Sequence, residues 1–122
     1  MDREIKFRGK RVDNGEWLTG DLIRDIKGVS EKIGTYDHLT CRIEVEVLSE
    51  TVGQFTGFSQ NKDEFYENDI CCDVIGRVFV IKWGSGGFWA FYSDNEQIPI
   101  IRVFCADVEK LGNIHDNPEL QS

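Results

Sequence analysis

The sequence contains no long apolar run and no apolar segment close to its first residue. A membrane-spanning helix needs about 20 mostly apolar residues, and no stretch of the chain approaches that length. Residues 1–6 are mostly charged, which is unlike a secretion signal. These absences predict a cytoplasmic protein with no membrane contact.

Histidine is scarce, which limits the side chains that could act as bases near neutral pH. His38 lies three residues before Cys41, but on a strand the two side chains would point to opposite faces. Only Arg42 is close enough in sequence to favour a thiolate at Cys41. His115 lies in a polar segment, where it is expected to decorate a turn. The sequence therefore predicts no catalytic residue and no enzyme.

Four cysteines are present, and a chain without a signal segment is expected to keep them reduced. Cys71 and Cys72 are neighbours, so their side chains should point to opposite faces of a strand and behave as small apolar groups. A zinc site built from these two with His38 and Cys41 lacks the paired spacing of structural zinc sites. We expect no metal or cofactor, and a redox or metal role for Cys71 and Cys72 stays open.

Charge is unevenly distributed along the chain. The net charge is −8, from 14 basic and 22 acidic residues, yet residues 1–11 hold five basic and two acidic side chains. A surface this acidic repels the phosphates of nucleic acids. A basic footprint for nucleic acid is therefore confined to the amino-terminal segment, whose members are Arg3, Lys6, Arg8, Lys10 and Arg11.

The first half of the chain predicts β-structure. Asn14-Gly15 is a strong hairpin signal because both residues tolerate positive φ, and it predicts a β-hairpin over residues 3–24. Residues 25–40 are polar and predict a longer loop or ragged strands. Residues 41–47 alternate apolar and charged side chains, which predicts a half-buried strand.

The second half predicts a meander of short strands separated by turn residues. Residues 106–112 are compatible with one helical turn or a further strand. Pro99 cannot occupy a central position in a strand ladder. The other segments are strands at 51–58, 65–74, 77–83, 88–92 and 98–104, with a break at 67–69 and a turn at 84–87.

A mainly β protein follows from these patterns, and its aromatic residues supply bulk for a small barrel core. The chain is the size of one domain, residues 1–122. A seam near residues 48–50 would divide it into an N-terminal β-hairpin unit, 1–48, and a C-terminal barrel, 49–122.

Several blocks of the sequence resemble the YopX family, in the same order and with similar spacing over nearly the whole chain. That resemblance implies a phage or prophage protein with a mainly β fold, an SH3-like small barrel at its C-terminal end, and no established activity. The blocks are residues 3–8, 17–21, 50–57, 65–70, the strand that ends at Trp83, and 112–120.

One block departs from the family pattern in an informative way. Asn68 stands where the family usually has glycine, and asparagine is the next-best residue for a left-handed turn. The position is therefore expected to serve backbone shape, as are Gly53 and Gly57. The predicted structural turn residues are Asn14, Gly15, Gly53, Gly57, Asn68 and Asp69.

Three carboxylates, Glu67, Asp69 and Asp73, lie close in sequence, and such oxygens suit a hard cation such as magnesium. The favoured interpretation is a solvated turn in which Asp69 accepts hydrogen bonds from nearby backbone amides. The glycines of residues 84–87 lack the lysine and helix of a phosphate loop, which favours a hairpin turn.

Two function classes remain. The first is a non-enzymatic protein-interaction module with an unknown host or phage protein as partner, or with a second copy in a homo-oligomer. The alternative is a nucleic-acid-binding accessory protein that uses the basic segment, with the aromatic side chains of Tyr66, Trp83 and Trp89 stacking on bases. The net charge disfavours this alternative.

Overall fold

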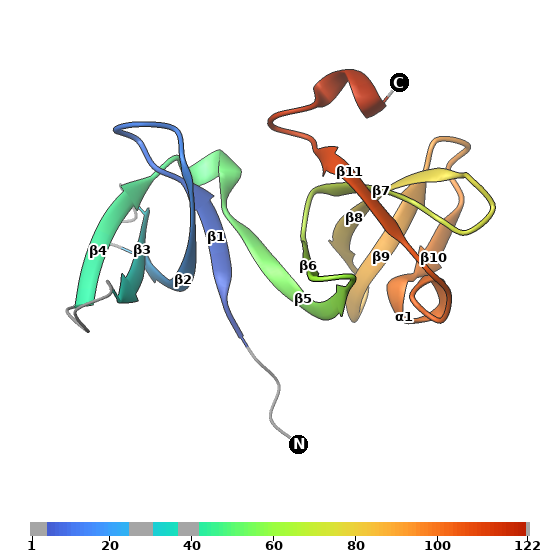
Figure 1. The fold of residues 1–122 in the computed structure, drawn as a ribbon, viewed down its shortest axis with the longest axis horizontal. Helices are drawn as coiled ribbons and strands as arrows, with labels where there is room; N and C mark the ends of the chain where they lie inside the picture. Colours follow the sequence, from blue (N-terminus) through green and yellow to red (C-terminus); the bar gives the residue numbers. More distant parts are fainter. Residues whose placement is uncertain (1–4, 25–30, 37–41, 122) are drawn as a thin grey trace. The chain divides into compact units, whose positions relative to one another are not determined.

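The computed structural model describes residues 5–24, 31–36 and 42–121, and most of them lie in antiparallel β-strands (Figure 1). The chain forms two compact units, residues 1–55 and 56–122. The strand β5 (Gly53–Gln60) carries the chain from unit 1 into unit 2. The segment predicted as the seam, residues 48–50, overlaps η1 (Ser49–Thr51), a short 3-10 helix. The boundary between the two compact units comes after residue 55.

Unit 1 is a sheet in which the first four strands are neighbours in chain order and β5 pairs with β1. Its hydrogen-bonded order is β4-β3-β2-β1-β5. The predicted hairpin is formed by the first two strands, and its loop contains Gly15 with φ of 75° and Asn14, whose Oδ1 accepts from Glu16 N at 2.9 Å. The strands are β1 (Phe7–Lys10), β2 (Trp17–Arg24), β3 (Glu31–Tyr36) and β4 (Arg42–Val47).

Of the longer loop or ragged strands predicted at residues 25–40, the described part, residues 31–36, is a strand. A continuous strand, β3, occupies part of that segment and pairs with β2 on one side and β4 on the other. Its charged and polar residues concealed the strand, but Ile33 on it is fully buried. The strand predicted at residues 41–47 is confirmed as β4 over its described part.

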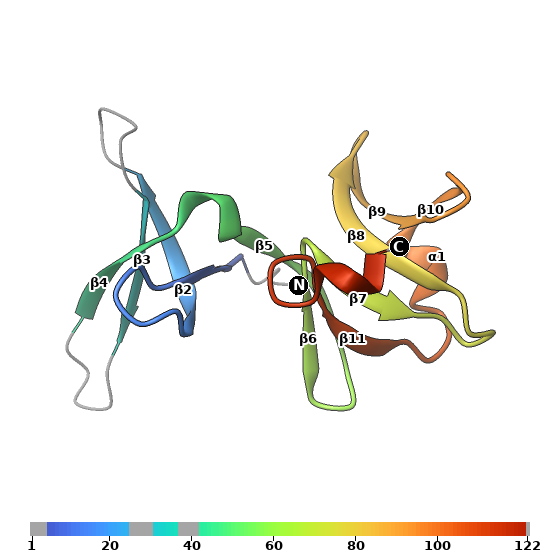
Figure 2. The same ribbon diagram turned by 90° about the horizontal axis from the view of Figure 1, so that it is seen from above.

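Unit 2 begins with the second half of β5, which is followed by β6, and continues as a five-stranded sheet of order β10-β9-β8-β7-β11. Figure 2 gives a second view of these strands. Their bounds, with the helical segments, are β6 (Asp63–Tyr66), β7 (Asp69–Cys72), β8 (Val78–Gly84), β9 (Gly87–Tyr92), β10 (Gln97–Pro99), α1 (Ile100–Val103), β11 (Glu109–Asn113) and η2 (Pro118–Gln121).

The mainly β prediction is confirmed, but two details differ. The strand predicted at 98–104 is wrong beyond Pro99, because this proline ends the edge strand β10 and the short helix α1 follows. Proline has no N–H with which to extend a ladder. In addition, β10 and β11 are the two open edges of the five-stranded sheet within the described residues, so a closed barrel is not confirmed.

The core of unit 2 follows from strand alternation. Phe88, Ala90 and Tyr92 point inward from β9, and Phe79 and Ile81 point inward from β8. The remaining buried members of this cluster are Phe65, Cys71, Ile100 and Val108. The same alternation explains the cysteine pair of β7, since the side chain of the first is fully buried and that of the second is half-buried.

The turn residues identified in the sequence differ in backbone conformation. Asn68 has φ of 75°, which confirms the left-handed conformation expected from the family pattern, and Gly57 has φ of 91° at an exposed bend in β5. Gly53 instead opens β5 and pairs with Arg8 of β1. The β6–β7 turn therefore depends on a residue that tolerates positive φ.

We expect Asn68→Gly to keep or slightly raise the stability of the protein, and Asn68→Ala to lower it by about 1 kcal/mol. Alanine lacks the side-chain polarity that lets asparagine adopt positive φ. Urea unfolding followed by circular dichroism measures both variants. Equal stability of the alanine variant and the wild type would contradict the backbone role of this residue.

Candidate functional site

The basic segment of β1 is packed onto aromatic rings. Lys6, Arg8 and Lys10 are spaced two apart, so their side chains share one face of the extended chain. The guanidinium of Arg8 lies 4.7 Å from the ring centroid of Trp17, and Lys10 Nζ lies 5.5 Å from the same ring. Lys6 Nζ lies 4.8 Å from the ring of Phe55. The structure thus brings three of the five predicted basic residues together.

Arg11 does not extend this face. Arg11 forms a two-pronged ion pair with Asp13, with Nε–Oδ1 and Nη2–Oδ2 distances of 2.9 and 2.8 Å. The hydrogen bonds raise the pKa of Arg11 and lower the pKa of Asp13. Arg3 lies outside the described residues.

The three aromatic candidates lie in unlike environments. Tyr66 is buried, and its hydroxyl donates to Glu64 Oε1 at 3.2 Å. Trp83 is 54% exposed and packs edge-on against Phe88, and Trp89 is half-buried on the opposite face of the β8–β9 hairpin. The structure therefore assembles no continuous stacking platform from the three, and only Trp83 presents a mainly exposed ring.

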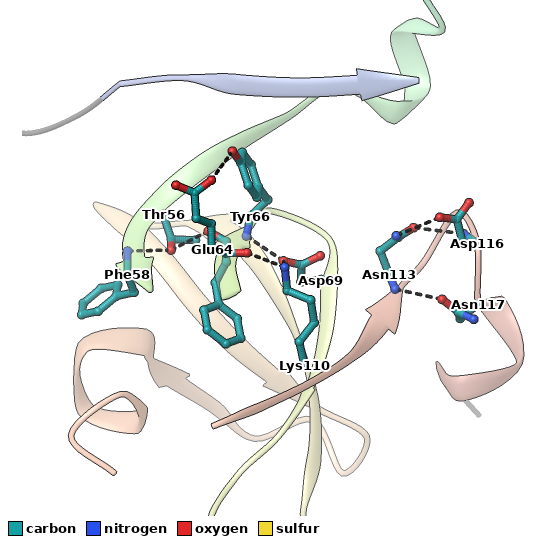
Figure 3. Close-up of polar contacts among 10 residues, drawn as sticks. Thr56, Phe58, Glu64, Tyr66, Asp69, Lys110, Asn113, Asp116 and Asn117 are labelled. Atoms are coloured by element: carbon teal, nitrogen blue, oxygen red, sulfur yellow. Dashed lines mark hydrogen bonds and ion pairs between the residues drawn. The ribbon is translucent and has the colours of Figure 1, made fainter. Parts of the chain in front are cut away.

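A buried carboxylate organises the start of β7. Asp69 is fully buried, and its Oδ2 accepts from Tyr66 N at 2.7 Å and lies 3.4 Å from Lys110 Nζ (Figure 3). Lys110 comes from β11, donates to the backbone oxygen of Glu64, and lies 5.2 Å from the ring of Phe65. The predicted bond from a backbone amide to Asp69 is confirmed, although the residue is buried and not solvated.

A second polar cluster folds the chain after β11. Asn113 is buried, and its Oδ1 accepts from the backbone amides of His115 and Asp116 at 3.0 and 2.9 Å. The backbone N–H of Asn113 donates to Asn117 Oδ1 at 3.3 Å (Figure 3). A Cβ on Gly112 would lie 2.2 Å from that same oxygen, so any other residue there would displace the side chain of Asn117 from this hydrogen bond. His115 thus lies in a turn, as predicted.

These two clusters are joined through the β6–β7 turn. The backbone oxygen of Asn68 accepts from Ile114 N at 3.0 Å, and Asn68 N donates to Ile81 O at 2.7 Å. Asn113 pairs with Asp69 across β11 and β7. Two sequence blocks far apart in the chain therefore form one structural element.

The carboxylate of Asp73 holds the β7–β8 turn. Its Oδ1 accepts from Ile75 N and Arg77 N at 3.1 and 2.9 Å, and its Oδ2 accepts from the hydroxyl of Tyr92 at 3.0 Å. The guanidinium of Arg77 lies 4.1 Å from the Tyr92 ring. Burial, helped by the hydrogen bond to Asp73, raises the pKa of Tyr92 to about 12.

The same turn borders a groove of about 300 Å³ that sequence reasoning did not identify. Val74 and Ile75, at the tip of the turn, are 67% and 75% exposed. Two adjacent aliphatic residues between Asp73 and Gly76 are the available signal, but Val74 ends the strand predicted at 65–74 and Ile75 lies in no predicted element. The groove is lined by Asp73, Val74, Ile75, Arg77, Tyr92, Ile98, Arg102, Val103 and Ala106.

The cysteine expectations are only partly settled. Cys71 packs in the core, as expected for a small apolar group, whereas Cys105 is exposed. His38 and Cys41 lie outside the described residues, so the catalytic pair and the zinc combination that include them stay untested.

Comparison with known proteins gives a family. The family model described as YopX protein matches residues 6–121, which is nearly the whole chain. No curated protein matches. In the described residues, no helix is long and apolar enough to cross a membrane.

The buried ion pair makes a stability prediction. Lys110→Met leaves the carboxylate of Asp69 buried beside an apolar side chain, so we expect a loss of about 3 kcal/mol in the free energy of unfolding. Adding Asp69→Asn should recover part of this loss, because the amide oxygen still accepts from Tyr66 N. Chemical denaturation measures both. The exposed Lys82→Met is the matched control, and equal stability of the two lysine variants would contradict the role of the pair.

The tyrosine pKa makes a pH prediction. Because the folded pKa of Tyr92 is raised from 10.0 to about 12, its contribution to stability is present below pH 10 and is lost as the pH rises through 12. Ultraviolet titration of tyrosinate, with Tyr92→Phe to assign the signal, measures this pKa. Asp73→Asn should move the pKa of Tyr92 back toward 10.0. An unchanged value would contradict the role given to Asp73.

Proposed function

The chain belongs to the YopX family, and we propose that this member is a non-enzymatic protein-interaction module. We further propose a phage or prophage accessory protein that works in the cytoplasm of a bacterial host. The family resemblance supports these parts of the proposal.

The observation that carries the proposal is that two exposed aliphatic side chains lie on the β7–β8 turn, which hydrogen bonds hold in place. Val74 and Ile75 are exposed, yet the turn that holds them is fixed by Asp73 through backbone amides. Exposed apolar side chains on a preorganised loop cost little to immobilise when a partner covers them. Adjacent exposed apolar side chains of this kind are a feature of protein-interaction surfaces.

The carboxylates weigh against an enzyme. Asp69 and Asp73, which could have served as acids, bases or metal ligands, accept hydrogen bonds that hold turns. Their role in stabilising these two turns is a sufficient reason for an aspartate at each position.

We also propose that unit 2 is an SH3-like barrel. Its support is the order of elements, a meander of short antiparallel strands with a short helix before the last strand, which returns beside β7. This likeness at the level of fold carries no activity by itself.

Nucleic-acid binding is the second candidate. Its support is the shared face of Lys6, Arg8 and Lys10 on β1, next to aromatic rings. The acidic remainder of the chain opposes it. Homo-oligomerisation is compatible with the first proposal, because the edge strand β10 offers unpaired backbone groups to a second copy.

Affinity purification from host or lysogenic cells tests the two candidates. We expect the tagged full chain to recover a protein partner in stoichiometric amount, identified by mass spectrometry. A parallel titration of labelled DNA should give weak binding. Recovery of no protein, together with tight and salt-sensitive DNA binding that Lys6→Glu with Lys10→Glu abolishes, would overturn the first candidate in favour of the second.

A further inference from the structure

The groove beside the β7–β8 turn has an apolar floor and one side chain of uncompensated charge. Ile98 and Val103 pack against the core of unit 2 and also line the groove, next to the exposed tip residues Val74 and Ile75. The walls therefore come from the β7–β8 turn, the end of β9, β10, and α1 with the loop after it. Tip and floor together form an apolar surface with a fixed shape.

The charges that line the groove differ in how they are satisfied. Both oxygens of Asp73 accept hydrogen bonds within the turn or from Tyr92. Arg77 Nη2 lies 2.6 Å from Glu96 Oε1 and 3.2 Å from Asp94 Oδ2. Arg102, by contrast, is exposed and makes no ion pair with any residue in the described part of the chain. Of the two arginines that line the groove, Arg102 is therefore the one without an ion pair to the described residues.

We propose that this groove is the partner-binding surface, and that its occupant is a protein segment in which an apolar side chain is followed or preceded by a carboxylate. The apolar side chain lies between Val74, Ile75 and Val103, and the carboxylate pairs with Arg102. This inference rests on the proposed function and names the surface and the chemistry of the partner.

Charge complementarity selects this occupant over others. Because the chain has a net charge of −8, a nucleic acid or an anionic membrane would be repelled over most of the surface, and one arginine does not compensate. A second copy carries the same net charge, so its approach is opposed by long-range repulsion. A short segment that brings a single carboxylate with an apolar neighbour meets the cation and covers the aliphatic tip.

Selection of random peptides by mRNA display against the full chain tests the proposal. We expect enriched peptides to combine an apolar residue with Asp or Glu. Val74→Ser with Ile75→Ser should weaken their binding about tenfold or more, because hot-spot truncation has this effect. Arg102→Glu should weaken binding several-fold and remove most of its salt dependence.

Matched controls separate the groove from general effects. Ile5→Ser with Val12→Ser removes two exposed aliphatic side chains from unit 1, and Lys62→Glu reverses an exposed charge in the β5–β6 turn. We expect both control variants to bind the peptides as the wild type does. Thermal unfolding checks that every variant is folded, which is expected because the substituted side chains are exposed.

The outcomes distinguish the groove from the wider proposal. Peptides that bind the groove variants and the wild type equally, enrichment of basic peptides, or no enrichment would overturn the groove assignment. A cellular partner that is recovered equally by the wild type and by the groove variants leaves an interaction module that uses another surface. Self-association lost on Val74→Ser with Ile75→Ser would replace the peptide segment by a second copy and overturn the proposed occupant.

Discussion

Unit 2 depends on satisfying one buried carboxylate. Asp69 has no exposed surface, and a buried charge is costly unless hydrogen bonds and an opposite charge compensate it. The compensation comes from the amide of Tyr66 and the ammonium of Lys110. The first requires the tight turn between β6 and β7, and the second requires β11 to lie against β7. One side chain thus connects a local turn to the edge strand β11 of the sheet.

The left-handed residue in that turn extends the same constraint. Positive φ at Asn68 lets the chain reverse within two residues, which places the amide of Tyr66 within reach of Asp69. The carbonyl of Asn68 then accepts from Ile114, just after β11 ends. Beyond it, Asn113 folds the chain back with its side-chain oxygen. Two of the blocks that resemble the YopX family, residues 65–70 and 112–120, therefore meet in space for structural reasons.

Sequence reasoning succeeded where the determinant is local. The loop with Asn14 and Gly15, the positive φ at Asn68 and the hairpin at residues 84–87 all follow from residue types with distinctive backbone preferences. Sequence reasoning failed on α1, because this four-residue helix consists mostly of β-branched apolar residues, which is the composition of a strand. The Asp69–Lys110 pair was beyond it, since nothing local in either residue specifies a partner on a distant strand.

The candidate site shows the same division between local and distant information. Residue type alone selects the basic and aromatic candidates, but their environments depend on pairing between strands, which buries Tyr66 and leaves Trp83 exposed. Most of the polar residues suited to chemistry hold turns or pack on rings.

Val74 and Ile75 are the reverse case, since the turn that carries them is rigid while their own side chains are mostly exposed to solvent. The backbone bonds to Asp73 would form equally well with polar residues at these two positions. The hydrogen bonds of the turn therefore do not require aliphatic residues at these positions, and a partner that covers them is the reason proposed for their presence.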